Sequence, residues 1–332
     1  MIPSFKKIFN KITGIYYYIG NNCFSNLINM RSIKYNKKVY IFTFAWGEHL
    51  DWYFKYVLPA LMNKTNTGAL AKDGFDVHYV LYTTDEKDKV MEKYNNNSNF
   101  QYIELIVFNK GNSTETRKIA VYPILDILKR GINEKAMLYQ ACADQVIGNS
   151  SLYNSVVTSY GKNKCFAFGN GRVSLDVLDD ITPYPSEGIE NSKLVSLCMK
   201  YPHDALKYAN EDLDKNNTID GVSFRKISSN LYSVTHNMPS PVVVFPIQED
   251  YEYFKKVNDY NQWDRGWVEL LIRSGRLKVS GSSDLFFFME LTTGRLDMNQ
   301  VLPNRRYNDE IPNPGICHRV SNIFISVWRS SE

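Results

Sequence analysis

The chain has 332 residues, of which 44% are hydrophobic, 22% charged and 14% aromatic, a composition typical of a folded globular protein. Its 39 basic and 35 acidic residues give a formal net charge of +4, too small to indicate nucleic-acid binding, and no base-reading motif is present. The 5 cysteines include no Cys-x-x-Cys pair, so the sequence predicts neither a zinc site nor a disulfide framework and favours a reducing compartment.

The first 37 residues form a unit of their own. Residues 1–20 place apolar side chains at helical spacing, with Lys6, Lys7 and Lys11 on other faces, which predicts a basic amphipathic helix. We interpret it either as a peripheral anchor on the inner face of a membrane or as a helix that docks on the protein or a partner. Residues 21–37 are expected to be a connector. The sequence contains no run of about 18 apolar residues, so it predicts no membrane-spanning helix. We expect a cytoplasmic location.

The next 110 residues alternate between two patterns. Residues 39–45, 75–83 and 101–108 are β-branched and aromatic runs, which predict buried strands. Between and after them, residues 49–63, 86–94 and 119–128 have helical spacing, although Pro59 should kink or end the first helix. This order predicts a mostly parallel central sheet flanked by helices, an α/β fold.

Residues 135–148 are the central stretch of the sequence. Their apolar run predicts one buried strand, whose end carries Asp144, followed by a turn and a helix over residues 152–160. In open α/β sheets, ligands bind at such carboxyl ends. Asp144 is also a common residue type in turns, so the stretch alone leaves both interpretations open.

The second half is less regular. Residues 164–168 predict a fifth strand, and residues 231–235, 242–246 and 277–280 are further strand-like segments, with helices at 192–200 and 268–273. We expect one domain over residues 38–332. Its less regular half, residues 176–332, is expected to supply pocket walls and loops rather than a separate core.

Several short segments resemble bacterial glycosyltransferase-like proteins of the GT-A fold. They are Phe42-Thr-Phe-Ala-Trp-Gly-Glu48, Leu81-Tyr-Thr-Thr-Asp85, the Asp144 strand with Gly148-Asn-Ser-Ser-Leu152, Thr235-His236-Asn-Met-Pro, and Gly281-Ser-Ser-Asp284. The resemblance covers roughly residues 38–290, and it implies a nucleotide-binding half at residues 38–175 and an acceptor-side half at residues 176–332. It implies a transferase that moves a sugar from a nucleotide-diphosphate donor to a surface-glycan or lipid-linked acceptor, as in polysaccharide biosynthesis.

The same resemblance raises the question of a metal. In this fold an Asp-x-Asp usually holds a divalent cation on the donor diphosphate, whereas the tripeptide here is Cys142-Ala143-Asp144. No metal ligand is therefore assigned, although Mg²⁺ or Mn²⁺ stays open. Without a metal, cationic side chains must neutralise the leaving diphosphate. The candidates are Arg172, Arg265, Arg273 and His236, and the alternative for each arginine is a solvated surface position.

The resemblance also implies which residues contact substrates. The turn at residues 43–48 would lie beside the nucleotide base, with residues 83–85 on its other side, and Trp46 would either stack on the base or pack at the strand end. The full expected substrate-binding set is Thr43, Phe44, Ala45, Trp46, Glu48, Thr83, Thr84, Asp85, Asp144, Gln145, Arg172, His236 and Asp284.

An inverting transfer needs a general base for the acceptor hydroxyl. Asp264 is the preferred candidate because Trp263 and Trp267 flank it, and Asp284 and Glu290 are alternatives. The two tryptophans equally fit a hydrophobic pair at a helix start.

Two other classes of function compete with the transferase. One is a degenerate GT-A-fold protein that binds a nucleotide sugar or a glycan without transfer, and the other is a hydrolase or nucleotidyltransferase on a similar sheet.

Overall fold

The computed structural model describes residues 34–109, 116–162, 164–168, 171–203, 217–219, 223–236, 240–260, 263, 266–292, 301–303, 319–320 and 323–331. The predicted amphipathic helix at residues 1–20 lies outside these ranges. Within them, no helix is long and apolar enough to cross a membrane.

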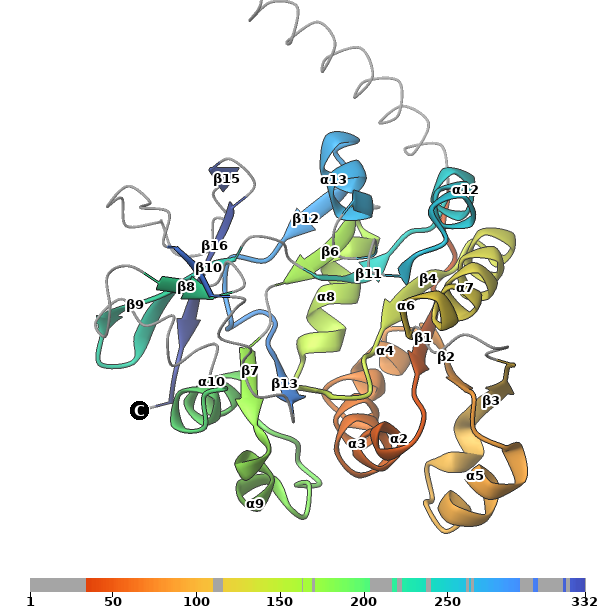
Figure 1. Cartoon of the computed structure of the whole chain (residues 1–332), viewed down its shortest axis with the longest axis horizontal. Coiled ribbons are helices and arrows are strands. Elements are labelled where there is room, and N and C mark those ends of the chain that lie inside the picture. Colours follow the sequence, from red (N-terminus) through yellow and green to blue (C-terminus); the bar gives the residue numbers. More distant parts are fainter. Residues whose placement is uncertain are drawn as a thin grey trace, which may run out of the picture.

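A seven-stranded sheet forms the centre of the molecule (Figure 1). Its order is β12 (Leu277–Val279), β6 (Cys165–Phe168), β11 (Ser240–Val244), β4 (Met137–Gln140), β1 (Lys38–Phe44), β2 (Asp76–Thr83) and β3 (Ile103–Val107). All its neighbouring pairs are parallel except those of β11, which runs antiparallel to β4 and β6. The mixed α/β architecture therefore agrees with the predicted, mostly parallel sheet.

Helices cover both faces of this sheet. On one face lie α2 (Glu48–Trp52), the π-helix η1 (Tyr53–Val57), α3 (Leu58–Met62), α4 (Thr67–Lys72) and α8 (Ser151–Tyr160). The other face packs against α7 (Val121–Glu134), α12 (Gln248–Val257) and α13 (Gly266–Arg273). Alternate residues of one strand separate accordingly, since Ile41 joins the first cluster of buried side chains and Phe42 joins the second.

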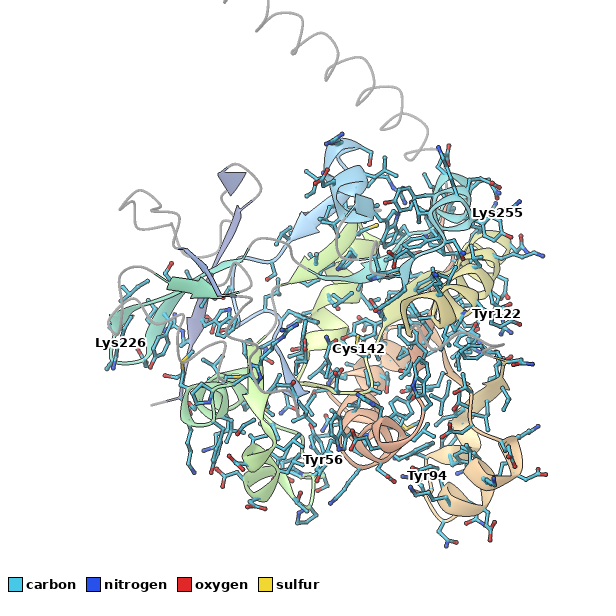
Figure 2. The ribbon with its side chains drawn as sticks, viewed as in Figure 1. Tyr56, Tyr94, Tyr122, Cys142, Lys226 and Lys255 are labelled. Carbon is cyan, nitrogen blue, oxygen red and sulfur yellow. The ribbon has the colours of Figure 1, made fainter. Side chains whose placement is uncertain are left out.

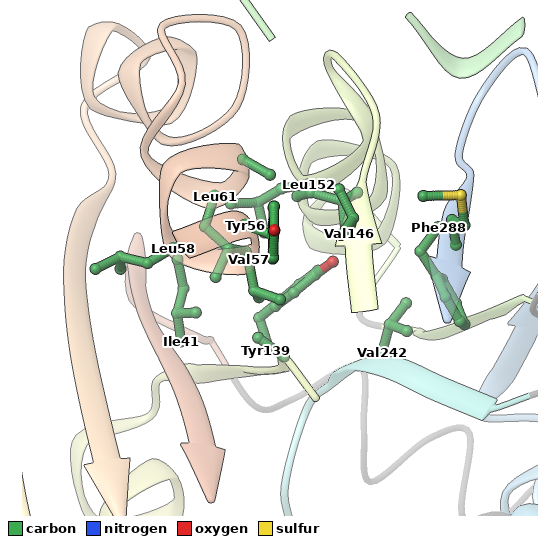
Figure 3. Close-up of a cluster of buried hydrophobic side chains, with 14 of the residues drawn as sticks. Ile41, Tyr56, Val57, Leu58, Leu61, Tyr139, Val146, Leu152, Val242 and Phe288 are labelled. Carbon is green, nitrogen blue, oxygen red and sulfur yellow. The ribbon is translucent and has the colours of Figure 1, made fainter. Parts of the chain in front are cut away.

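Figure 3 shows the first of these faces, where Ile41 and Tyr139 from the sheet meet Val57, Leu58 and Leu61 from the helices. The predicted break at Pro59 takes an unexpected form. The helix continues through it, and the amide of Leu58 bonds to the carbonyl of Tyr53, five residues back. This π-type turn precedes a proline that has no amide to donate.

The remaining helices and short turns lie outside these two groups: α5 (Lys87–Tyr94), η2 (Phe100–Tyr102), α6 (Thr116–Ile119), η3 (Leu175–Val177), α9 (Leu178–Ile181) and α10 (Asn191–Lys200). Cys165 and Cys198 are buried free thiols.

The described residues also form three smaller sheets. One contains β5 (Gln145–Ile147), β13 (Phe288–Thr292) and β7 (Gly171–Ser174) in that order. Another contains β15 (Arg319–Val320), β16 (Ile323–Arg329), β10 (Leu231–His236) and β9 (Ser223–Ser228), and the last pairs β14 (Val301–Pro303) with β8 (Asn217–Ile219).

Two expectations need correction. Residues 135–148 form two strands in different sheets, because the chain leaves the central sheet after Gln140 and turns where the amide of Gln145 bonds to the carbonyl of Cys142. Asp144 lies in this connection rather than at the end of one long strand. The second half also does more than supply loops, since β11 and β12 are strands of the central sheet.

Candidate functional site

The carboxyl ends of β1, β2 and β4 lie at one edge of the central sheet, because these strands are parallel. The loops after β1 and β2 are tied together there. The backbone amide of Gly47 donates to Oδ2 of Asp85 at 3.0 Å, and the amide of Asp85 donates to Oγ1 of Thr83 at 3.1 Å. The structure thus brings together the two segments that were expected on either side of a nucleotide base.

Gly47 has a backbone conformation that favours glycine, with φ of 58° and ψ of −134°. This conformation lets its amide reach Asp85 while the chain turns directly into α2. A glycine here therefore sets the shape of the loop.

The small sheet of β5, β13 and β7 brings three charged residues from distant parts of the chain together. Glu290 in β13 pairs with Gln145 in β5 on one side and with Arg172 in β7 on the other. Nε of Arg172 lies 3.0 Å from Oε1 of Glu290, and the amide of Leu291 donates to the carbonyl of Asp144 at 2.7 Å. We call Asp144, Arg172 and Glu290 the charged cluster.

The charged cluster begins four residues after the end of β4, so it adjoins the carboxyl edge of the central sheet. Cys142, in the same connection from β4 to β5, lies near the middle of the molecule in Figure 2. Open α/β sheets bind their ligands at this edge.

Asp144 is partly buried, and the Glu290 side chain is 16% exposed. Burial and, after it, the negative charge of Glu290 raise the pKa of Asp144 to about 7, while the Arg172 guanidinium opposes this rise. Two carboxylates and one cation therefore lie together where solvation is poor, so the protonation state of one group affects the pKa of the others.

The charged cluster contributes two carboxylates, Asp144 and Glu290. Among the residues that the structure describes, no three His, Cys, Asp or Glu side chains gather to hold a metal ion. The carboxylate of Glu290 is moreover already paired with Arg172. In this arrangement the charge available to neutralise a phosphate is the guanidinium.

The other expected contact residues of the two loops divide by exposure. Glu48 is exposed, while Phe44, Trp46, Thr84 and Asp85 are half-buried. Thr43, Ala45 and Thr83 are buried, at 1%, 2% and 0% exposed, so their side chains cannot contact a ligand directly in this conformation. Thr83 instead shapes the loop through its hydrogen bond from the Asp85 amide.

Two further candidates lie in surface ion pairs. Asp284 precedes β13, and its Oδ2 lies 3.3 Å from Nε of Arg329, with both side chains more than half exposed. Arg273 pairs with Glu269 one helical turn away and is 76% exposed. Neither belongs to the charged cluster, so Arg273 occupies the solvated position that was its alternative.

The tryptophans proposed to flank a sugar site are core residues instead. Trp263 and Trp267 are 2% and 0% exposed, their ring centroids are 4.4 Å apart, and Trp267 donates to Oδ1 of Asp250. They therefore form the hydrophobic pair that was the other interpretation of their spacing. Asp264 and Arg265 lie outside the described residues. His236 is described only through its backbone, which pairs with Phe324.

Tyr260 is a residue at this edge that the sequence did not indicate. Its ring lies 4.9 Å from that of Phe44, and its hydroxyl accepts a hydrogen bond from Nε2 of Gln140 at 2.6 Å. It thus joins the last residues of β1 and β4. Only its place three residues before Trp263, in the aromatic loop, could have suggested it.

Comparisons with known proteins give little further constraint. No protein-family model and no curated protein matches the chain. Among solved structures, the chain is similar to S. aureus TarS residues 1–349, with 14% identity, a TM-score of 0.28, and 41% of this chain and 36% of that chain covered. A second TarS structure gives 14% identity, a TM-score of 0.27, and coverage of 42% and 22%. Scores this low do not establish a shared fold, and the chain spans little more than a third of the better-covered structure.

Proposed function

We propose that this protein is a nucleotide-sugar-dependent glycosyltransferase that acts on a glycan or lipid-linked acceptor. The observation that carries the proposal is the convergence of Asp144, Arg172 and Glu290 beside the carboxyl edge of a mostly parallel sheet. This is the edge at which the sequence resemblance puts the donor. The similarity to TarS is too small to add weight.

Each member of the charged cluster has a proposed role. Arg172 would bind the donor diphosphate and stabilise the charge that develops on it as the glycosidic bond to phosphate breaks. Glu290 positions Arg172 through the 3.0 Å ion pair. Asp144 would accept a hydrogen bond from a ribose or sugar hydroxyl, and its raised pKa means that it can also hold a proton near neutral pH.

The loops after β1 and β2 would hold the nucleoside. The Trp46 side chain is half-buried and packs with the cluster that contains Phe42, so part of the ring is available for stacking. The bond from the Gly47 amide to Asp85 keeps the two loops at a fixed separation.

A donor screen tests the proposal. Thermal unfolding is measured with UDP-, GDP-, TDP- and CMP-sugars, each with Mn²⁺ and with EDTA, because a ligand that binds only the folded state raises the midpoint. We expect one family of diphosphate donors to stabilise the protein about equally under both conditions, since Arg172 supplies the cation. No stabilisation by any donor would contradict nucleotide-sugar binding, and stabilisation lost in EDTA would assign Asp144 and Glu290 to a metal.

Turnover then separates a transferase from a protein that only binds. The departure from the acidic tripeptide pattern at Cys142-Ala143-Asp144 is the feature that favours the second possibility. Release of free nucleoside diphosphate from the stabilising donor in the presence of glycan acceptors is expected for the transferase.

A further inference from the structure

A group of lysines lies at the opposite edge of the central sheet from the charged cluster. Lys34 precedes β1, Lys135 precedes β4, Lys162 and Lys164 precede β6, and Lys278 is the second residue of β12. These strands are mutually parallel, so their starts lie at the same edge of the sheet. We call these five residues the amino-edge lysines.

Hydrogen bonds hold the segments that carry these lysines side by side. The amide of Asn36 donates to the carbonyl of Lys135 at 2.8 Å, and the hydroxyl of Tyr160 donates to the carbonyl of Tyr35 at 3.4 Å. Tyr35 and Asn36, which follow Lys34, therefore contact the end of α8 and the loop of Lys135. Within the described residues, none of the amino-edge lysines forms an ion pair.

Like charges are in fact held close together on this face. Partial burial and, after it, the positive charge of Lys162 lower the pKa of Lys278. The acidic groups nearby are mostly engaged elsewhere, since Glu134 pairs with Lys38 and Asp73 accepts from the Tyr153 hydroxyl. Asp76, the first residue of β2, pairs with Lys38 and His78, and Glu249 is close enough to influence the Tyr35 hydroxyl.

The sequence that enters the fold at this face is basic as well. The first 47 residues contain Lys6, Lys7, Lys11, Arg31, Lys34, Lys37 and Lys38 and no Asp or Glu, since Glu48 is the first acidic residue. Residues 1–20 also carry the apolar side chains at helical spacing that predict an amphipathic helix. Apolar burial together with lysine charge is the combination that binds anionic bilayers.

We propose that the amino-edge lysines form a face that lies on an anionic membrane, next to the point where the basic N-terminal segment joins the fold. Lipid is favoured over nucleic acid because the adjoining segment combines its charge with regularly spaced apolar residues, whereas no base-reading motif accompanies the lysines.

With the amino-edge lysines on a membrane, the protein has a fixed orientation that constrains the acceptor. This step rests on the proposed function. The charged cluster adjoins the far edge of the sheet, and the seven residues of β1 span roughly 20 Å between the two edges. The donor site would then face away from the bilayer. A glycan long enough to reach it fits this geometry better than a sugar at the lipid head group.

Vesicle binding of the full chain tests the face. Co-sedimentation is measured with phosphatidylcholine vesicles, with and without phosphatidylglycerol, for the unmodified protein and for a triple variant that combines Lys34→Gln, Lys162→Gln and Lys164→Gln. The matched control combines Lys87→Gln, Lys193→Gln and Lys226→Gln, which are exposed lysines on other elements. In Figure 2, Lys226 lies at the other end of the molecule from Lys255 of α12.

We expect binding to anionic vesicles only, weakened roughly 100-fold by the first triple variant, at about five-fold for each lysine, and little changed by the control. Equal effects of the two triples, no effect of the first, or no binding by the unmodified protein would each overturn the proposal. Single-stranded RNA provides a further arm, in which loss of RNA binding with intact vesicle binding would assign the face to nucleic acid instead. None of these outcomes depends on donor binding, so failure here is distinguishable from failure of the proposed function.

Discussion

Asp144 lies in the connection just before β5, Glu290 lies in the neighbouring strand β13, and Arg172 pairs directly with Glu290. The raised pKa of Asp144 follows from this arrangement, because a partly buried carboxyl beside another carboxylate keeps its proton longer than a solvated one. Groups with a shifted pKa are common at functional sites, where charged side chains serve ligand binding rather than stability.

Replacing Asp144 should therefore change the pH dependence of stability. In the unfolded chain this carboxyl ionises near 3.8, whereas in the folded protein it ionises at about 7. Between these values the folded state binds more protons, so the free energy of unfolding falls as pH rises through this window and levels off above it. Asp144→Asn, which carries no titrating group, removes that fall.

Above pH 7 the Asp144→Asn variant should exceed the unmodified protein in stability by about 1–2 kcal/mol, a value reduced from the full linkage because the group is partly exposed. At the acidic end the difference should vanish. Urea unfolding at several pH values measures this, with the exposed Asp284→Asn as the control. Parallel pH profiles for Asp144→Asn and the unmodified protein would show that Asp144 is an ordinary surface carboxylate.

The sequence could indicate the members of the charged cluster but not their contacts. Asp144 was identifiable because an apolar run stops at a carboxylate, and Arg172 and Glu290 were each named as candidates. Their meeting depends on β13 inserting between β5 and β7, a pairing of segments more than 110 residues apart. Such non-local strand order leaves no local pattern, and for the same reason Asp284 could not be separated from Glu290.

Among the elements, α12 is fixed by a buried ion pair. Both guanidinium ends of Arg276 bond to Asp250, at 2.8 and 2.6 Å, and the two side chains are 4% and 0% exposed. Asp250 also accepts from the Trp267 indole and from the amide of Ile247. This network joins α12 and α13 to the start of β12, behind the strands that carry the site.

Breaking this pair from one side should destabilise the fold strongly. Asp250→Asn leaves a buried guanidinium without its counter-charge, and we expect a loss of about 3–5 kcal/mol in the free energy of unfolding. The surface pair of Arg273 and Glu269 provides the comparison, since Glu269→Gln should cost no more than about 0.5 kcal/mol. Denaturant unfolding of both variants measures the two changes in the free energy of unfolding. Equally small losses for Asp250→Asn and Glu269→Gln would mean that Asp250 contributes little.

Elements were predicted well where a local pattern determines them. The β-branched runs over β1, β2 and β3 and the apolar stripe of the first helices needed no knowledge of distant contacts. Trp263 and Trp267 show the limit, because spacing alone does not distinguish a core pair from a sugar platform. Their burial depends on α12 and the sheet packing around them.

At the scale of the whole molecule, two groups of charged residues lie at opposite edges of the central sheet. The carboxyl edge adjoins the charged cluster and the tied loops after β1 and β2, and the amino edge carries five lysines. One half of the sequence supplies most strands of this sheet, yet β11 and β12 from the second half complete it. A protein arranged in this way could bind an anionic surface with one edge and a nucleotide sugar with the other.

The central claim is that Arg172 recognises a diphosphate at the carboxyl edge, and calorimetry with matched nucleotides tests it most directly. Binding of the nucleoside diphosphate and monophosphate of the base found in the donor screen is compared for the unmodified protein, Arg172→Gln and the exposed Arg273→Gln. We predict that Arg172→Gln weakens diphosphate binding by about 10- to 100-fold, as expected for a lost charged hydrogen bond, while monophosphate binding and the Arg273→Gln protein are little changed. Unaltered diphosphate affinity in Arg172→Gln, or an equal loss for both nucleotides, would contradict the claim.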